Sequence, residues 1–115
     1  MYVYDKANEL ASLIKQSKEY TDYKMLKDEL YSDPGTKKML MDYKKIQFEA
    51  QAMYLSGKEV SSELMDKLKK SGEVLQFNPK ITEFFAAEYK FNTLISDIYK
   101  IIGDACDIDM DMFRE

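Results

Sequence analysis

The side chains that could do chemistry in this sequence are few, and they lack the neighbours that catalysis needs. The 115 residues include no histidine and one cysteine, Cys106. A chain without imidazole has no Ser-His triad and no histidine metal ligand. One thiol cannot form an intrachain disulfide, and by itself it cannot build a zinc or iron–sulfur site. Because acidic neighbours disfavour a thiolate, we expect Cys106 to be inert.

The acidic residues near the C-terminus resemble the start of a calcium-binding loop. Asp107, Asp109 and Asp111 alternate as the first ligands of such a loop do. Met112 stands where the loop requires glycine, however, and no glutamate occupies its twelfth position. We therefore expect no metal site, and we predict that residues 106–115 form an acidic, frayed tail.

Glu88 is a carboxylate in an otherwise apolar line that continues through Ile81, Ile95 and Ile102. Burying an unpaired carboxylate is costly, so Glu88 must have a partner or reach water. It can pair with a lysine or a tyrosine hydroxyl of the same fold, or pair across a subunit interface and fix its register. Catalysis is a third interpretation, but no second acid, histidine or metal ligand stands at helical spacing beside it. We predict no catalytic or cofactor-binding residue, and we keep Glu88 as a candidate interface residue.

The hydrophobic pattern predicts the helices that position these side chains. Apolar residues recur at three- and four-residue spacing, and no sustained alternation of period two occurs. The predicted helices span Tyr4–Gln16, Glu19–Tyr31, Pro34–Leu55, a segment that begins at Ser61 and includes Leu75, and Pro79–Ala105. We therefore predict an all-α fold of about five helices. It would be a single helical domain over residues 1–105, an elongated bundle with long third and fifth helices that dimerises.

Local signals mark the ends of these helices. The third and fifth begin with a cap acceptor directly before a proline, at Asp33-Pro34 and Asn78-Pro79. Ser17 and Ser61 are cap acceptors for the second and fourth, and Ser56-Gly57 ends the third. Gly72 weakens the fourth helix, and we expect a neighbouring backbone to approach closely there.

The fifth predicted helix carries the strongest heptad pattern of the chain. Its apolar residues alternate spacings of three and four along one face, which is wide enough to contact more than one neighbour. This face is either the core of a helical bundle or, in part, a contact with a second chain. Its members are Phe84, Ala87, Phe91, Leu94, Ile98, Ile101 and Ala105.

The third predicted helix has two apolar stripes on opposite faces. One contains Met39, Tyr43, Ile46, Ala50 and Met53, and the other contains Met41, Phe48 and Leu55. A surface helix of a monomer needs only one apolar face. The second stripe is therefore packed internally or binds another protein. We predict a partner interface at Met41, Phe48 and Leu55.

The charge pattern argues against nucleic acid as the main partner. The net charge is −4, and Arg114 is the only arginine among 17 basic residues. A phosphate-binding protein is usually basic, and arginine is the residue that reads bases with two hydrogen bonds. The pairs Lys37-Lys38, Lys44-Lys45 and Lys69-Lys70 favour solvated faces, with an RNA-associated accessory protein as the alternative. No signal peptide or membrane-spanning run occurs, so we expect a cytoplasmic protein.

The order of these signals resembles the YlbF/YmcA family of small helical bacterial proteins. The resemblance covers about residues 2–103. Its residues are Asp33-Pro34, Lys37-Lys38-Met39-Leu40, the run Gln47–Met53, Gly57-Lys58-Glu59-Val60-Ser61, Leu75, Asn78-Pro79-Lys80-Ile81, Glu88, Phe91, Ile98 and Ile101-Ile102-Gly103.

The resemblance implies a self-associating, non-enzymatic regulator. The best-known members control competence, sporulation and biofilm formation within a multi-protein complex that influences messenger-RNA processing. Some members hold iron–sulfur clusters with cysteines, but this chain has only Cys106. We therefore expect a regulatory adaptor without a cofactor. Its expected partners are a second copy of itself and other proteins of an mRNA-processing regulatory complex.

Overall fold

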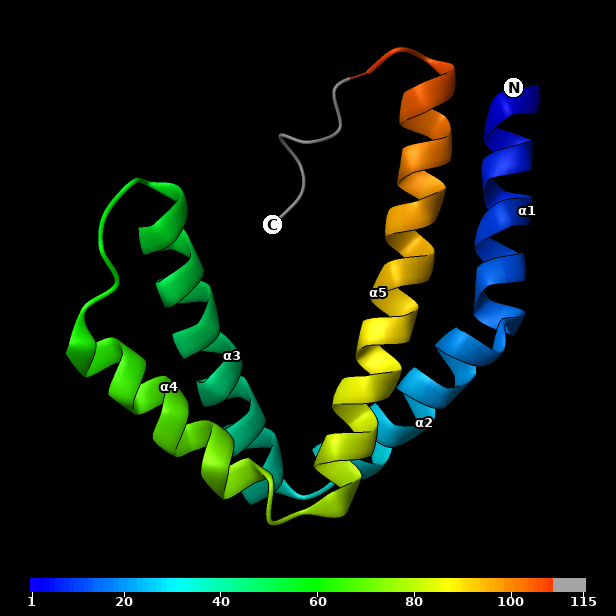
Figure 1. Ribbon diagram of the computed structural model, residues 1–115. Coiled ribbons are helices and arrows are strands. Elements are labelled where there is room, and N and C mark those ends of the chain that lie inside the picture. Colours follow the sequence, from blue (N-terminus) through cyan, green and yellow to red (C-terminus); the bar gives the residue numbers. More distant parts are fainter. Residues whose placement is uncertain (109–115) are drawn as a thin grey trace. The chain divides into compact units, whose positions relative to one another are not determined.

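The computed structural model describes residues 1–108, and within that range the chain forms five helices and no strand (Figure 1). No helix in this range is long and apolar enough to cross a membrane. The all-α prediction is confirmed, and the predicted helix ends differ from the observed ones by two residues at most. The helices are α1 (Tyr2–Gln16), α2 (Lys18–Tyr31), α3 (Pro34–Leu55), α4 (Ser62–Leu75) and α5 (Pro79–Ala105).

The four predicted N-terminal caps are all present. Each cap side chain accepts a hydrogen bond from a backbone N–H in the first turn of its helix, which satisfies a donor that the helix cannot. The pairs are Tyr20 N–H to Ser17 Oγ (3.2 Å), Thr36 N–H to Asp33 Oδ2 (3.2 Å), Leu64 N–H to Ser61 Oγ (3.1 Å) and Lys80 N–H to Asn78 Oδ1 (3.0 Å).

Helices α3 and α5 end in the same way, with a residue in the left-handed region. Gly57 has a φ of 81°, and the next N–H, of Lys58, donates to a carbonyl five residues back. After α5, Asp107 has a φ of 56°, and Ile108 N–H donates to the Gly103 carbonyl at 2.9 Å. Both are Schellman ends, which glycine favours. Residues 106–108 of the predicted frayed tail form this turn, and the rest of that predicted tail, from residue 109, lies outside the described residues.

The contacts within the chain group its residues into two compact units. Of the described residues, the central unit is residues 29–82, and the terminal unit combines residues 1–28 with residues 83–108. The single-domain expectation for residues 1–105 stays a prediction. Each unit is described by itself below.

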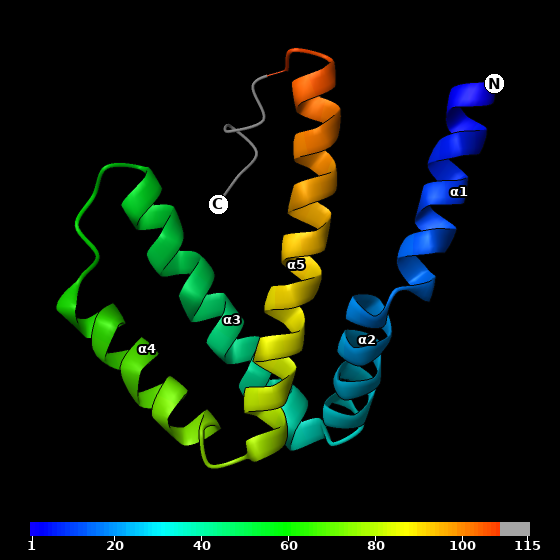
Figure 2. The same cartoon turned by 45° about the vertical axis from the view of Figure 1, so that its right-hand side comes forward.

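The central unit is built on the pair α3 and α4, which lie side by side (Figures 1 and 2). Its apolar core includes two leucines that are almost wholly enclosed, Leu40 and Leu75. An ion pair between Glu29 and Lys80 joins the last turn of α2 to the first turn of α5. The buried apolar residues of this unit are Leu30, Leu40, Ala50, Leu75 and Ile81.

Gly72 of α4 has a different close neighbour from the one that the sequence predicts. A Cβ atom added there would lie 3.6 Å from Cε1 and 3.7 Å from the hydroxyl of Tyr43 on α3. The expectation of a neighbouring backbone is therefore wrong, because an aromatic side chain fills this place. The distances are ordinary van der Waals contacts, so alanine would fit at residue 72.

The terminal unit has an aromatic core between α2 and α5. The Tyr23 ring stacks on Phe84 and on Phe91, with centroids 5.7 and 5.0 Å apart, and Tyr20 meets Phe91 at 5.5 Å. Phe84 is fully buried. This cluster confirms the first part of the heptad face of α5 as core. Farther along the same face, Ile101 is 68% exposed, so the heptad pattern continues beyond the buried part of α5.

Candidate functional site

The three residues predicted as an interface on the third helix lie in one exposed line on α3. Met41, Phe48 and Leu55 are 52%, 64% and 63% exposed, and their seven-residue spacing places them on the same side. The opposite side of α3 carries the buried Ala50, and the buried Leu40 lies roughly a quarter turn from the line. We call the three residues the α3 stripe.

Two further exposed residues complete this line. Lys45 and Ala52 fall between the members of the α3 stripe, so the spacing alternates four and three from residue 41 to 55. This is the spacing of a coiled-coil seam. Sequence analysis missed Ala52, although the signal was the same three–four alternation that identified α5.

The two edges of the α3 stripe differ in charge. Asp42 and Glu49 follow the apolar positions on one edge, and Lys37 and Lys44 lie on the other. Such edges decide the partner and orientation of paired helices.

Glu88 lies in the other unit, on α5, and is half-buried. It takes part in an interaction within the chain, so it is not an uncompensated buried charge. The structure therefore brings Met41, Phe48 and Leu55 together on one helix and places Glu88 on a different element. Its role at an interface stays a prediction.

The lysine pairs are mixed with acidic residues. Lys38 Nζ lies 2.8 Å from Asp42 Oδ2, and the Lys37 ammonium lies 6.0 Å from the centroid of the Tyr31 ring. A pairing of this kind reduces the positive potential that a phosphate backbone would meet. The expectation of solvated faces and its RNA-binding alternative both remain predictions.

One carboxylate in the central unit has a perturbed proton affinity. The Thr36 hydroxyl donates to Asp33 Oδ2 at 2.6 Å, and the Thr36 N–H donates to the same oxygen. These two hydrogen bonds favour the charged form and hold the pKa of Asp33 below its ordinary value. Asp33 is therefore a cap, with no geometry that points to catalysis.

Metal-binding groups do not gather in the part of the chain that the structure describes. Among residues 1–108 there is no cluster of three histidine, cysteine, aspartate or glutamate side chains that could hold an ion. Cys106 is exposed and is not in a disulfide. Asp109 and Asp111 of the calcium-like motif lie outside the described residues.

Comparison with protein families and curated relatives gives matches along almost the whole chain. Residues 3–107 match the family model described as control of competence regulator ComK, YlbF/YmcA. The chain is 37% identical over 108 residues to a UPF0342 protein of Symbiobacterium thermophilum, covering 94% of this chain and 96% of that protein. It is 39% identical over 108 residues to a UPF0342 protein of Halothermothrix orenii, covering 94% and 92%.

Two solved structures share the fold. A protein of unknown function (DUF964) from Bacillus stearothermophilus aligns with a TM-score of 0.73 at 17% identity, over 93% of this chain and 94% of that one. A chain from the crystal structure of Bacillus subtilis RicA in complex with RicF aligns with a TM-score of 0.59 at 22% identity, over 92% and 94%. At these identities the likeness concerns the fold.

Proposed function

The chain belongs to the YlbF/YmcA family of competence regulators, and on that premise we propose that it is a non-catalytic adaptor that acts through protein–protein contacts. The crystal structure of RicA in complex with RicF supports the proposal, because it is a protein complex that contains a chain of this fold. The finer expectations, a cytoplasmic protein and a link to mRNA processing, stay predictions of the sequence and of the family resemblance.

The observation that carries the proposal is the α3 stripe. Phe48 lies in its middle and is 64% exposed, on the side of α3 opposite the buried Ala50. Large aromatic side chains in the centre of an exposed apolar patch are typical anchors of protein interfaces. We infer that the stripe binds the same stripe of a second copy of this chain.

The charged edges of the stripe favour a parallel pair of α3 helices. In a parallel pair, the basic edge of one helix faces the acidic edge of the other, so Lys44 lies near Glu49 of the second copy. An antiparallel pair would bring acidic edges together. Ala52 leaves room for close approach, and Lys45 is the single polar seam residue of the kind that fixes register at some cost in stability.

The test is the solution mass of wild type and of Phe48→Glu, measured by light scattering over a range of concentrations. Burying a phenylalanine is worth about 2–3 kcal/mol, so its loss should weaken self-association by about 100-fold. The variant should therefore have half the wild-type mass at the same concentration, while its far-UV circular dichroism stays helical.

A matched control is Gln47→Glu, which introduces the same charge one residue away and off the stripe. It should keep the wild-type mass. A wild type of 13.5 kDa at every concentration would contradict self-association through this helix. An unchanged mass in Phe48→Glu would show that the stripe is not the interface.

Glu88 is tested separately with Glu88→Gln, which removes the charge and keeps the volume. If Glu88 contributes to an interface, the variant should associate more weakly with no change in its melting temperature under dissociating conditions. A lower melting temperature with unchanged association would place Glu88 among the internal contacts of the terminal unit.

A further inference from the structure

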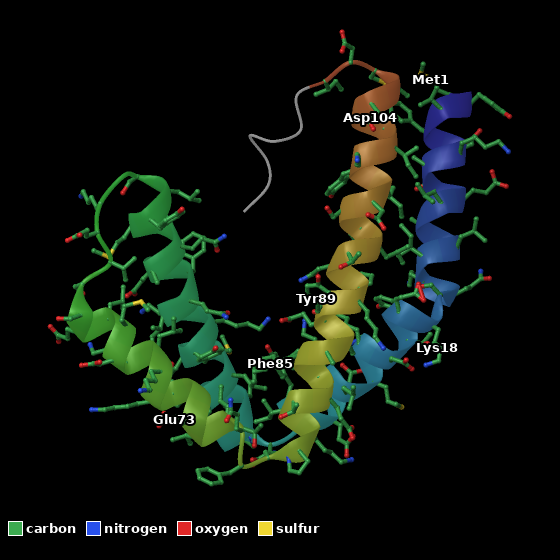
Figure 3. All side chains as sticks on the ribbon, viewed as in Figure 1. Met1, Lys18, Glu73, Phe85, Tyr89 and Asp104 are labelled. Atoms are coloured by element: carbon green, nitrogen blue, oxygen red, sulfur yellow. The ribbon has the colours of Figure 1, made fainter. Side chains whose placement is uncertain are left out.

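One member of the α3 stripe carries a side chain that a mild oxidant can modify. Met41 has a thioether and is 52% exposed, whereas Phe48 and Leu55 offer no atom that a peroxide attacks. Side chains project from α3 on the side away from α4 as well as toward it (Figure 3). The Met41 sulfur is therefore accessible to a dissolved oxidant in the single chain.

Oxidation changes the polarity of Met41 without changing its place on the helix. One oxygen of hydrogen peroxide is transferred to the sulfur: an S–O bond forms, the O–O bond breaks and water leaves. The sulfur thereby loses two electrons, which the peroxide gains. The product, methionine sulfoxide, is a polar group at a position where the stripe needs an apolar one. Burying that group in an interface costs free energy unless its oxygen keeps a hydrogen bond.

Lys45, the next seam residue, favours the oxidised side chain in the separate chain. It is exposed and lies four residues after Met41. Residues four apart on a helix are neighbours, so the Lys45 ammonium can donate a hydrogen bond to a sulfoxide oxygen at residue 41. Closing the seam over this pair would remove water from a charged group as well as from the sulfoxide.

Other exposed methionines lie off the stripe and serve as internal controls. Met25 on α2 is 63% exposed and Met65 on α4 is 49% exposed, so an oxidant in solution reaches them as readily as Met41. Of the methionines among residues 1–108, only Met41 belongs to the stripe. An effect of oxidation on the stripe can therefore be assigned to one residue.

We propose that Met41 is an oxidation site whose conversion to the sulfoxide releases the α3 stripe from its second copy, and whose reduction restores the contact. This inference rests on the proposed function, because it names a modification that regulates the same surface. In a parallel pair of α3 helices, Met41 lies beside Met41 of the second copy, so an oxidised dimer would bury two sulfoxides. Burial of a methionine side chain strengthens binding by a factor of ~10 or more, so complete oxidation should weaken association at least ~10-fold.

The test compares wild type with Met41→Leu, which keeps an apolar side chain of similar volume. Both proteins are treated with hydrogen peroxide, and peptide mass spectrometry measures the sulfoxide at each methionine. Light scattering should give oxidised wild type a lower mass than untreated wild type, with far-UV circular dichroism that stays helical. Oxidised Met41→Leu should keep its untreated mass. The matched control Met65→Leu should lose mass on oxidation as wild type does, and methionine sulfoxide reductases should restore the mass of both.

The outcomes separate this inference from the proposed function. An untreated wild type that is monomeric at every concentration contradicts the proposed function, and this regulation with it. If untreated wild type is a dimer and keeps its mass when Met41 is fully oxidised, the stripe contact stands and only the inference is wrong. An equal loss of mass in oxidised Met41→Leu also overturns the inference, because oxidation of another residue would then be responsible.

The rate of oxidation provides a second measurement. At a concentration at which wild type is a dimer, Met41 should be oxidised several-fold more slowly, relative to Met25, than in Phe48→Glu. The reason is that the paired stripe covers residue 41, whereas Met25 lies on another helix. Equal relative rates in the two proteins would overturn the inference, because Met41 would then be outside the contact.

Discussion

The central and terminal units use their apolar residues in different ways. The central unit encloses Leu40 and Leu75 between α3 and α4, which contact each other, and it leaves the α3 stripe and separate side chains such as Phe77 exposed. The terminal unit has a well-packed aromatic cluster around Tyr23 and Phe84, but α1 has no buried residue and the end of α5 is exposed. The central unit therefore packs along the length of α3 and α4, whereas the terminal unit is packed mainly where α2 meets the first part of α5.

One heptad pattern can continue from a buried core onto an exposed surface along a single helix. Phe84 and Ile101 belong to the same face of α5, yet the first is fully buried and the second is 68% exposed. Burial in the monomer and burial against a second chain impose the same periodicity on a sequence. Only the positions of the other helices distinguish them.

The largest expected difference concerns the two cores. Leu40→Ala should lower the free energy of unfolding by about 3 kcal/mol, because Leu40 is fully enclosed and the cavity would not collapse. Ile14→Ala should cost about 1 kcal/mol, since Ile14 on α1 is only half-buried. Urea unfolding of both variants, under conditions in which the chain is monomeric, measures the contrast. Equal losses would contradict the account of α1 as weakly packed.

The caps provide a smaller contrast. Ser61→Ala should destabilise the central unit by about 1 kcal/mol, because the N–H of Leu64 loses its acceptor. Ser17→Ala removes the equivalent bond to Tyr20 in the terminal unit and should cost about 0.5 kcal/mol. The smaller value follows from the weaker packing of α1, which lets the junction between α1 and α2 rearrange. Thermal unfolding of each variant beside wild type measures the two losses of stability, and the loss for Ser61→Ala should be the larger.

The smallest effect expected is a pH dependence that originates at Asp33. Its pKa is lowered in the folded chain, so the stability it contributes is fully present above the unfolded pKa, about 4, and disappears as the pH falls through the folded value. Asp33→Asn should be less stable than wild type at pH 7, and this difference should shrink as the pH falls from 5 to 2. Urea midpoints at several pH values measure it. A difference that stays constant with pH would mean that the Asp33 charge does not contribute.

The parts of the structure that could be predicted from sequence are the local ones. Ser17, Asp33, Ser61 and Asn78 each satisfy backbone donors within three residues, so their spacing alone identified the caps and the helix boundaries. The α3 stripe was also predictable, because its opposition to the buried face depends only on helical periodicity.

The rest depends on contacts between residues far apart in the sequence. The neighbour of Gly72 is a tyrosine from another helix, which no local pattern specifies. Likewise, the grouping into two units and the exposure of Ile101 depend on contacts between helices, so the α5 heptad alone could not tell which of its residues are buried.

The most direct test of the central claim, that the α3 stripe binds a second copy of the chain, is the solution mass of Phe48→Glu beside the control Gln47→Glu. The account predicts a helical monomer of 13.5 kDa for Phe48→Glu at concentrations at which wild type and Gln47→Glu have twice that mass. A Phe48→Glu mass equal to that of wild type would contradict it, because the stripe would then have no part in assembly.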